Sequence, residues 1–459
     1  MKNIRWIFIA IAVLTLCACF SEWAGDEGTI TIALGAVPRS LGDRADIPRF
    51  TYTVTLVGTG GTIHQPFTGT NAVMKVMPGK WNVTVKAYHL IYDAYWSKEE
   101  LRAMGEKTIT VKAGQNPPET VTMISASDVR SLKELRDCIN PAGDPPGEEI
   151  IIIKNDIPTA EEKRLFSSDP YPLDSIRISG NSRITLIAET PVTISSNGLF
   201  GGYDRDNVPR GFFHVVPAGS LTLGREGMSG TITIDGTNVY PGGMEIPMIF
   251  VDAGAALLMN DKVTLRNNRA GAVEISGTDY YDDSDEEPVT PGEFTMNGGT
   301  IAGNTAYLGG AVMNDGIFTM NGGAISENKA YKGGGVYNGG DDGIFTMKGG
   351  TIKDNTTDDM GPGGGVYNTG TFTMEGGTIS ENEAGWGGGV YADGTTSLAG
   401  GIITGNKIWE QDRADGGGKE RPKRGAGAYY SSRDFYAPDS ILTVVTENNP
   451  DDFFVPLPR

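Results

Sequence analysis

Four near-identical stretches decide the fold of this chain: FTMNGGTIAGN at 294–304, FTMNGGAISEN at 318–328, FTMKGGTIKDN at 345–355 and FTMEGGTISEN at 372–382. Their opening phenylalanines are separated by 24, 27 and 27 residues. A fixed period of about 20 to 30 residues is typical of a solenoid, in which each repeat is buried by its neighbours. The repeat therefore predicts a shape and a binding surface, and it specifies no reaction.

Each block contains three short apolar or β-branched runs. The first is Phe-Thr-Met, the second is Thr-Ile or Ala-Ile after a Gly-Gly pair, and the third is a Gly-rich segment that continues into Val and ends in Met-Asn or Tyr-Asn. Runs this short, with glycine pairs beside them, do not form helices. Three strands in 24 residues indicate one coil of a parallel β-helix, with coils stacked about 4.8 Å apart. A fifth block at 396–406 and drifted coils upstream extend the predicted β-helix over 148–445, with regular repeats at 294–430.

Stacked coils place identical residues in columns. We expect the Phe, Met and Ile of each block to point inward, because side chains alternate along a strand. An asparagine follows each isoleucine by three residues, at a turn where asparagine tolerates left-handed backbone and its amide bonds to the copy in the next coil. We interpret this ladder as structural. Its members are Asn304, Asn328, Asn355, Asn382 and Asn406.

The first 19 residues have the pattern of an export signal. Lys2 and Arg5 precede the apolar run 6–16, which is too short for a stable membrane anchor. The following Leu-Cys-Ala-Cys resembles a bacterial lipobox, and Cys19 is the expected acylated residue. The residues after it carry no acidic retention signal, which favours the outer membrane and the cell surface. An ordinary cleaved secretory signal is the alternative.

The rest of the chain divides into modules. After a linker at 20–28, alternating strands over 29–124 predict a β-sandwich, Ig-like or transthyretin-like. Residues 127–139 predict a helix with Ser127 or Asp128 as its cap, and with the turn to 147 this helix should cover the first coil. We expect residues 446–459 to form a C-terminal tail.

The amino-acid composition limits the classes of partner and cofactor that we expect for this chain. The chain has a net charge of −19, and −21 without Lys2 and Arg5, because 57 acids then face 36 bases. This acidity argues against nucleic acid and anionic lipid as partners, and it favours a soluble monomer. With Cys19 acylated and the signal removed, Cys138 is the only free cysteine. We expect it to be a small, buried apolar side chain. The three histidines, His64, His89 and His214, lack a metal-binding spacing, and we expect no cofactor.

The second and third runs of each block resemble a known repeat. Ile325-Ser-Glu-Asn328 followed by Gly333-Gly-Gly-Val336 is similar to the paired signatures Phe-x-x-Asn and Gly-Gly-Ala-Ile of the polymorphic outer-membrane protein (Pmp-type) adhesins. The resemblance covers 294–430 well, with Ile in place of Phe in the first signature. It implies a right-handed parallel β-helix of pectate-lyase-like architecture in a surface adhesin. The chain ends in DDFFVPLPR without the family's anchoring barrel, so a lipid anchor would replace it.

Two sets of aromatic residues are candidate binding sites for a glycan or an extracellular protein. One set follows the ladder asparagines, and the other follows the inward valines and should point outward. Cross-strand stabilisation is the alternative interpretation. The first set is Tyr307, Tyr331, Trp386 and Trp409, and the second is Tyr337, Tyr367, Tyr391 and Tyr429.

An acidic insertion at 278–292 is a weak calcium candidate. It offers many oxygen ligands but lacks the glycine turn and spacing of an EF-hand loop, so a solvated acidic loop is the preferred interpretation. The candidate ligands are Asp279, Asp282, Asp283, Asp285 and Glu287.

The predicted function is non-catalytic adhesion or surface recognition by a lipid-anchored β-helix protein. A polysaccharide lyase or glycosidase is the first alternative, because related architectures carry such enzymes, and a purely structural surface protein is the second. An enzyme needs carboxylates beside an arginine or lysine on adjacent coils. In this chain only the irregular coils around Asp252, Arg266, Arg269 and Glu274 offer such residues.

Overall fold

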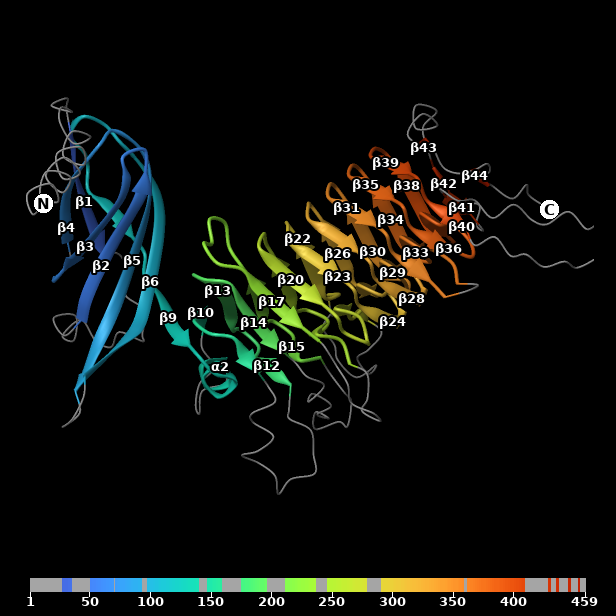
Figure 1. Ribbon diagram of the computed structural model, residues 1–459, viewed down its shortest axis with the longest axis horizontal. Helices are drawn as coiled ribbons and strands as arrows, with labels where there is room; N and C mark the ends of the chain where they lie inside the picture. The colour runs from blue at the N-terminus through green and yellow to red at the C-terminus, as the bar shows by residue number, and fades with distance from the viewer. Residues whose placement is uncertain are drawn as a thin grey trace, which may run out of the picture. The chain divides into compact units, whose positions relative to one another are not determined.

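The computed structural model describes residues 27–34, 50–69, 71–92, 97–139, 147–158, 175–195, 211–236, 246–278, 290–358 and 361–408, and the backbone of four short strands after residue 427. The chain divides into two compact units, Met1–Ala126 (unit 1) and Ser127–Arg459 (unit 2). Almost all regular structure in the described part is β-strand, which confirms the all-β prediction. Figure 1 shows the strands of both units.

Unit 1 contains two sheets that share one core. In the first sheet β1 pairs antiparallel with β4 and parallel with β7 and β8; in the second, antiparallel strands follow the order β3-β2-β5-β6. The bounds are β1 (Gly28–Leu34), β2 (Phe50–Gly58), β3 (Gly61–Phe67), β4 (Asn71–Val76), β5 (Gly79–Tyr92), β6 (Ser97–Val111), β7 (Gly114–Gln115) and β8 (Glu119–Val121). Alternate residues of both sheets, including Ile30, Tyr52 and Trp81, are buried in a single cluster. The Ig-like or transthyretin-like assignment stays a prediction.

The helix that follows is shorter than the sequence predicted. Residues 124–129 form strand β9 (Ile124–Val129), so Ser127 and Asp128 lie on a strand and do not cap a helix. Helix α2 (Leu132–Ile139) begins after Ser131, whose Oγ accepts a hydrogen bond from the Glu134 backbone N–H at 3.2 Å. The apolar face of α2 is buried as predicted and packs against the first turn of the solenoid.

Unit 2 is built from three long parallel sheets, and each coil contributes one strand to each sheet (Figure 1). The first sheet runs β10 (Glu148–Ile153), β13 (Arg183–Ala188), β16 (Ser220–Leu223), β19 (Ala256–Met259), β22 (Glu293–Met296), β26 (Ile317–Met320), β30 (Ile344–Met347), β34 (Thr371–Met374), β38 (Thr395–Leu398) and β42 (Phe435–Tyr436). This arrangement is the one predicted from the repeat, a stack of parallel β coils.

The second and third sheets have the same coil-by-coil order. The second sheet runs β11 (Ile157–Pro158), β14 (Val192–Ser195), β17 (Ile232–Asp235), β20 (Val263–Arg266), β23 (Thr300–Ala302), β27 (Ala324–Ser326), β31 (Thr351–Lys353), β35 (Thr378–Ser380), β39 (Ile402–Thr404) and β43 (Val445–Thr446). The third runs β12 (Ile176–Ile178), β15 (Phe213–Val215), β18 (Ile249–Val251), β21 (Val273–Ile275), β25 (Val312–Asn314), β29 (Val336–Asn338), β33 (Val366–Asn368), β37 (Val390–Ala392), β41 (Ala428–Tyr430) and β44 (Phe453–Phe454).

A short fourth sheet lies where the sequence predicted only a turn. It contains β24 (Thr305–Leu308), β28 (Lys329–Lys332), β32 (Thr356–Thr357), β36 (Glu383–Ala384) and β40 (Lys407–Ile408). In the coils from β24 to β36 a glycine with positive φ, such as Gly309, forms the next corner (the glycine corner). The segment between the ladder asparagine and this glycine is long enough for a strand, as from Asn304 to Gly309. In the coil before β24 the same segment runs only from Asn268 to Gly271, so the fourth sheet begins at β24.

The core of unit 2 is made of like residues in columns. Phe294, Phe318, Phe345 and Phe372 are buried, and neighbouring rings stack with centroids 4.8 to 5.0 Å apart. The Met and Ile columns are buried as well. Direct register between identical residues, such as Phe318 with Phe345, produces this stacking and confirms the predicted inward positions.

Candidate functional site

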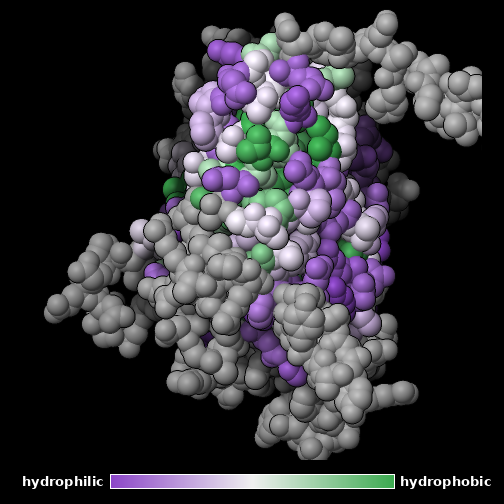
Figure 2. Space-filling model, turned by 90° about the vertical axis from the view of Figure 1, so that its left-hand side faces the viewer, coloured by the Kyte–Doolittle hydropathy of each residue, from purple (hydrophilic) through white to green (hydrophobic). Residues whose placement is uncertain are grey.

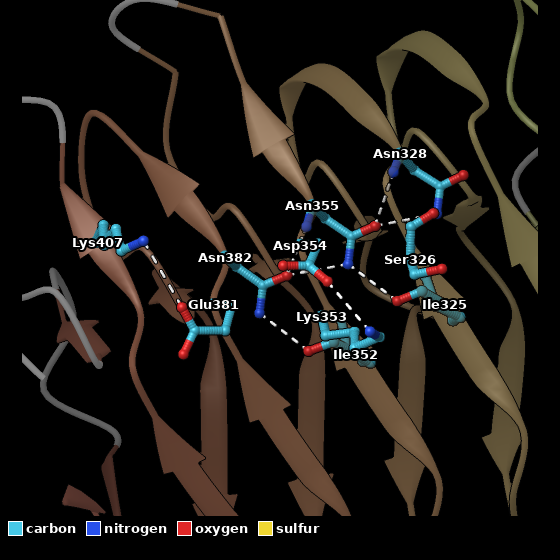
Figure 3. A network of polar contacts seen from close by, with 10 residues as sticks. All are labelled: Ile325, Ser326, Asn328, Ile352, Lys353, Asp354, Asn355, Glu381, Asn382 and Lys407. Atoms are coloured by element: carbon cyan, nitrogen blue, oxygen red, sulfur yellow. Dashed lines mark hydrogen bonds and ion pairs between the residues drawn. The ribbon is translucent and has the colours of Figure 1, made fainter. Parts of the chain in front are cut away.

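The predicted asparagine ladder forms a continuous chain of hydrogen bonds inside the solenoid (Figure 3). The Asn328 backbone N–H and its Nδ2 both donate to Oδ1 of Asn355 at 3.0 Å, and Nδ2 of Asn328 also donates to the Ile301 carbonyl at 3.0 Å. The same pattern joins the other ladder members, and it extends upstream to Asn268, whose N–H donates to Oδ1 of Asn304. These side chains are buried, so the ladder closes turns and offers nothing to a ligand.

The left-handed backbone lies one residue before the position that we expected. Glu327, Asp354 and Glu381 have φ values of 58°, 54° and 55°, and Gly303 and Gly405 occupy the same position in their coils. The asparagine itself points inward, because its amide replaces the backbone partners that the turn removes. The prediction of left-handed asparagines is therefore wrong, and the strained residue is its neighbour.

A second buried ladder runs along the third sheet and was missed in the sequence analysis. Asn314 Nδ2 donates to Oδ1 of Asn338 at 2.6 Å, and Asn338 Nδ2 donates to Oδ1 of Asn368 at 2.7 Å. Asn368 then donates to Oγ1 of Thr396 at 2.9 Å. The recurrence of Val-Met-Asn and Val-Tyr-Asn at the end of the third run was the available signal.

The tyrosines of the third sheet stack but are largely covered. The ring centroids of Tyr337 and Tyr367 are 5.3 Å apart, and those of Tyr367 and Tyr391 are 5.2 Å apart. Tyr367 is only 6% exposed, so the prediction of an exposed platform is wrong at the centre of this column. Burial raises the pKa of Tyr367 to about 12 and also raises the pKa of Tyr337. Tyr429 is in register with Tyr391 on β41, and its side chain lies outside the described residues.

The same column continues into the irregular coils with different residue types. Strand pairing aligns Met313 with Glu274, Glu274 with Phe250, Phe250 with His214 and His214 with Arg177. His214 and Phe250 are buried, whereas Arg177 is exposed. The tyrosine stack is thus one part of a longer column. The other members of this column could not be recognised from the sequence, because they do not repeat the tyrosine.

The exposed aromatic pair lies on the fourth sheet. Tyr307 on β24 is 71% exposed and Tyr331 on β28 is 40% exposed. Their rings are nearly parallel, with an interplanar angle of 9° and centroids 5.2 Å apart. This pair is the most exposed aromatic surface among the side chains that the structure describes.

Trp386 does not belong to the tyrosine pair. An isolated β-bridge pairs Trp386 with Pro362. Both residues come directly before the glycine corner of their coil, which is the position of Lys332 in β28. Tyr331 is one residue earlier in its coil than Lys332, so Trp386 is not in register with Tyr307 and Tyr331, and the first set of aromatic residues does not form one column. Trp409 lies outside the described residues, as do Cys19 and the acidic positions 279–289.

The residues proposed for catalysis are not gathered at one place. Arg266 on β20 of the second sheet forms an ion pair with Asp235 on the neighbouring coil, at 2.7 Å from Nε to Oδ2. Asp252 and Glu274 belong to the third-sheet side of the coil, where Asp252 Oδ2 lies 2.9 Å from Nε2 of the buried His214. Arg269 lies at the turn that follows the second sheet.

No group of three or more potential metal ligands is present among the described residues. No helix in the described part of the chain is long and apolar enough to cross a membrane. Cys138 on α2 is partly buried, and burial raises its thiol pKa to about 11, which keeps it protonated at neutral pH.

Unit 1 carries exposed apolar side chains of a different kind. They are Val57 on β2, Val73 on β4 and Met77 just after β4. Figure 2 shows hydrophobic surface gathered in one region of the visible face among hydrophilic side chains. These residues are aliphatic and lack the coil-to-coil register of the fourth-sheet tyrosines.

Comparison of the chain with protein-family models, curated proteins and solved structures found no match.

Proposed function

We propose that this protein is an exported bacterial lipoprotein that recognises a glycan or protein ligand at the cell surface, in adhesion and without catalysis. The observation that carries the proposal is the stacked, exposed pair Tyr307 and Tyr331. Large aromatic side chains are costly to leave in water, and soluble proteins seldom align them on a surface unless a partner covers them.

The remaining parts of the proposal come from sequence patterns. The lipobox-like stretch ending at Cys19 supports acylation and attachment to the outer membrane, and the alternating strands of unit 1 support an Ig-like or transthyretin-like spacer. The repeat supports a right-handed, pectate-lyase-like β-helix of the type that Pmp-type adhesins use. The placement of Arg266 on a different sheet from Glu274 and on a different side of the coil from Asp252, in an ion pair with Asp235, argues against the enzyme alternative.

A retention assay on immobilised polysaccharides and extracellular-matrix proteins tests this function. The secreted form lacking the signal and Cys19 should be retained by at least one ligand without releasing fragments. A Tyr307→Ala/Tyr331→Ala double variant should lose about tenfold or more in affinity, because removing buried aromatic contacts costs about 1 to 3 kcal/mol.

A matched control is the Ile344→Ala/Ile402→Ala double variant, which removes two exposed aliphatic side chains from the first and second sheets. It should bind as the unmodified protein does. Equal loss in both double variants would contradict a site at the tyrosines, and new reducing or unsaturated sugar ends would replace adhesion by catalysis. Separately, Cys19→Ser should move the protein from the membrane fraction to the soluble fraction of its cells.

A further inference from the structure

The start of the fourth sheet forms a step in the surface of unit 2. Strand β24 is its first strand, and the preceding coil passes from Asn268 to Gly271 without a strand at this position. The two coils remain bonded there, since the Thr305 N–H donates to the Asn268 carbonyl and the Gly271 N–H donates to the Thr305 carbonyl. Residues 269–271 therefore lie along the foot of the step formed by β24.

Among the described residues, no ring stacks on the face of Tyr307 that points toward this step. Tyr331 stacks against the other face, from the coil on the far side. Tyr307 is accordingly the more exposed of the two rings, at 71% against 40%. An exposed aromatic face next to a backbone segment fits a saturated sugar ring, because the C–H groups on one face of a pyranose carry partial positive charge and the aromatic face is negative.

The foot of the step stays low because its residues are small. Ala270 is followed by Gly271, which has a φ of 76°. A Cβ at Gly271 would lie 3.0 Å from the Gly309 carbonyl oxygen and 3.7 Å from Cβ of Ala306, so a larger residue would press against the base of β24.

Arg269 places an exposed positive charge at the same position in the coil. Its backbone is beside Thr305, its side chain is exposed, and it forms no ion pair with any residue that the structure describes. The nearby Lys329 differs, because its Nζ lies 2.8 Å from Oδ1 of Asp358. An exposed guanidinium on the segment next to the strand of Tyr307 favours a ligand carrying a carboxylate, which arginine binds through two parallel N–H···O bonds.

We propose that the step formed by Tyr307, Arg269 and Gly271 binds a uronic acid residue of a glycan, with the sugar ring on Tyr307 and its carboxylate on Arg269. This inference rests on the proposed surface-recognition function and names the chemistry of the ligand. It involves no bond making or breaking.

A matched pair of disaccharides tests it on the secreted form of the full chain. Cellobiouronic acid and cellobiose differ only by a carboxylate in place of a hydroxymethyl group, and saturation-transfer NMR titration measures the affinity for each. The unmodified protein should bind the acid about tenfold more tightly, as expected for a charge-assisted bidentate contact. Arg269→Gln should make the two affinities equal, and Tyr307→Ala should abolish binding of both sugars.

Two further variants control for folding and for net charge. Tyr307→Phe keeps the ring and should retain the preference for the acid, and Arg183→Gln removes another exposed arginine of unit 2 and should change neither affinity. Equal affinity of the unmodified protein for the two sugars would overturn the uronic acid assignment. Failure to bind either sugar would overturn the saccharide site, while retention on a matrix protein in the panel assay would leave surface recognition standing.

Discussion

At the scale of single residues, the ladder asparagines explain why the turns of unit 2 tolerate burial. Oδ1 of Asn355 accepts bonds from both the backbone N–H and Nδ2 of Asn328, and its own Nδ2 donates to the Ile325 carbonyl and to Oδ1 of Asn382. One side chain thus satisfies buried groups in the coils on both sides (Figure 3). An unpaired buried amide or carbonyl costs about 1 to 3 kcal/mol, so each asparagine matters more than one surface hydrogen bond.

Replacing a ladder asparagine should therefore destabilise unit 2 strongly. Asn355→Ala leaves several buried partners unpaired, and we expect a loss of about 3 kcal/mol in the free energy of unfolding. Asn321→Ala is the matched control, because Asn321 is exposed and its Nδ2 donates to Asn297 at 2.9 Å. Its loss should be below about 0.5 kcal/mol. Urea denaturation followed by circular dichroism measures the free energy of unfolding of both variants. Similar losses would contradict the claim that the buried ladder asparagines stabilise unit 2 more than exposed ones do.

At the scale of elements, the turn after each second-sheet strand combines a left-handed residue with an inward asparagine. Non-glycine residues in left-handed backbone are strained by about 1 to 2 kcal/mol. Glu327 has this backbone, and two coils of the same solenoid place Gly303 and Gly405 there instead. The repeat thus contains its own comparison between a strained and an unstrained turn.

Glu327→Gly should raise the stability of unit 2 by about 0.5 to 1 kcal/mol, since relief of strain exceeds the entropy that glycine loses on folding. Glu375→Gly is the control, because Glu375 is also exposed but does not have left-handed backbone. That change should leave stability unchanged or lower it. Thermal melting of both variants tests this prediction. A lower melting temperature for Glu327→Gly would show that the Glu327 side chain stabilises unit 2 by more than the strain of its left-handed backbone costs.

At the scale of the whole molecule, the two units have separate cores built on different principles. Unit 1 buries alternate residues of two mainly antiparallel sheets, whereas unit 2 buries columns of like residues that stack from coil to coil. Because the two units form separate compact bodies with different cores, we expect them to unfold separately.

Core substitutions should then lower one of two unfolding transitions at a time. Leu56→Ala in unit 1 and Phe345→Ala in unit 2 each truncate a fully buried side chain, at an expected cost of about 2 to 5 kcal/mol. Differential scanning calorimetry should show the first variant shifting one transition and the second variant shifting the other. A single transition that moves in both variants would mean that the units unfold cooperatively.

Much of the fold of unit 2 could be predicted from the sequence because the same residue pattern recurs in several coils. Ile325 and Asn328 have counterparts in all five blocks, and Phe318 has counterparts in four of them, with Thr396 in the fifth; alternation along a strand decides which of these residues are buried. The drifted coils were harder to interpret, since Glu274 and His214 occupy the tyrosine column without resembling a tyrosine. Helix α2 was placed too early because Ser127 and Asp128 suit a cap as well as a strand.

The sequence by itself determined the stacked parallel coils, the inward columns and the asparagine ladder, because an exact repeat in register must place like residues over like. Exposure was decided only by the tertiary structure. Tyr367 and Tyr307 are both candidate binding residues in the sequence, yet Tyr367 is 6% exposed and Tyr307 is 71% exposed. The difference arises from the neighbouring coils. Tyr367 has a stacked ring on each face, whereas Tyr307 lies on the first strand of a sheet, because the segment from Asn268 to Gly271 in the preceding coil is too short to form a strand there.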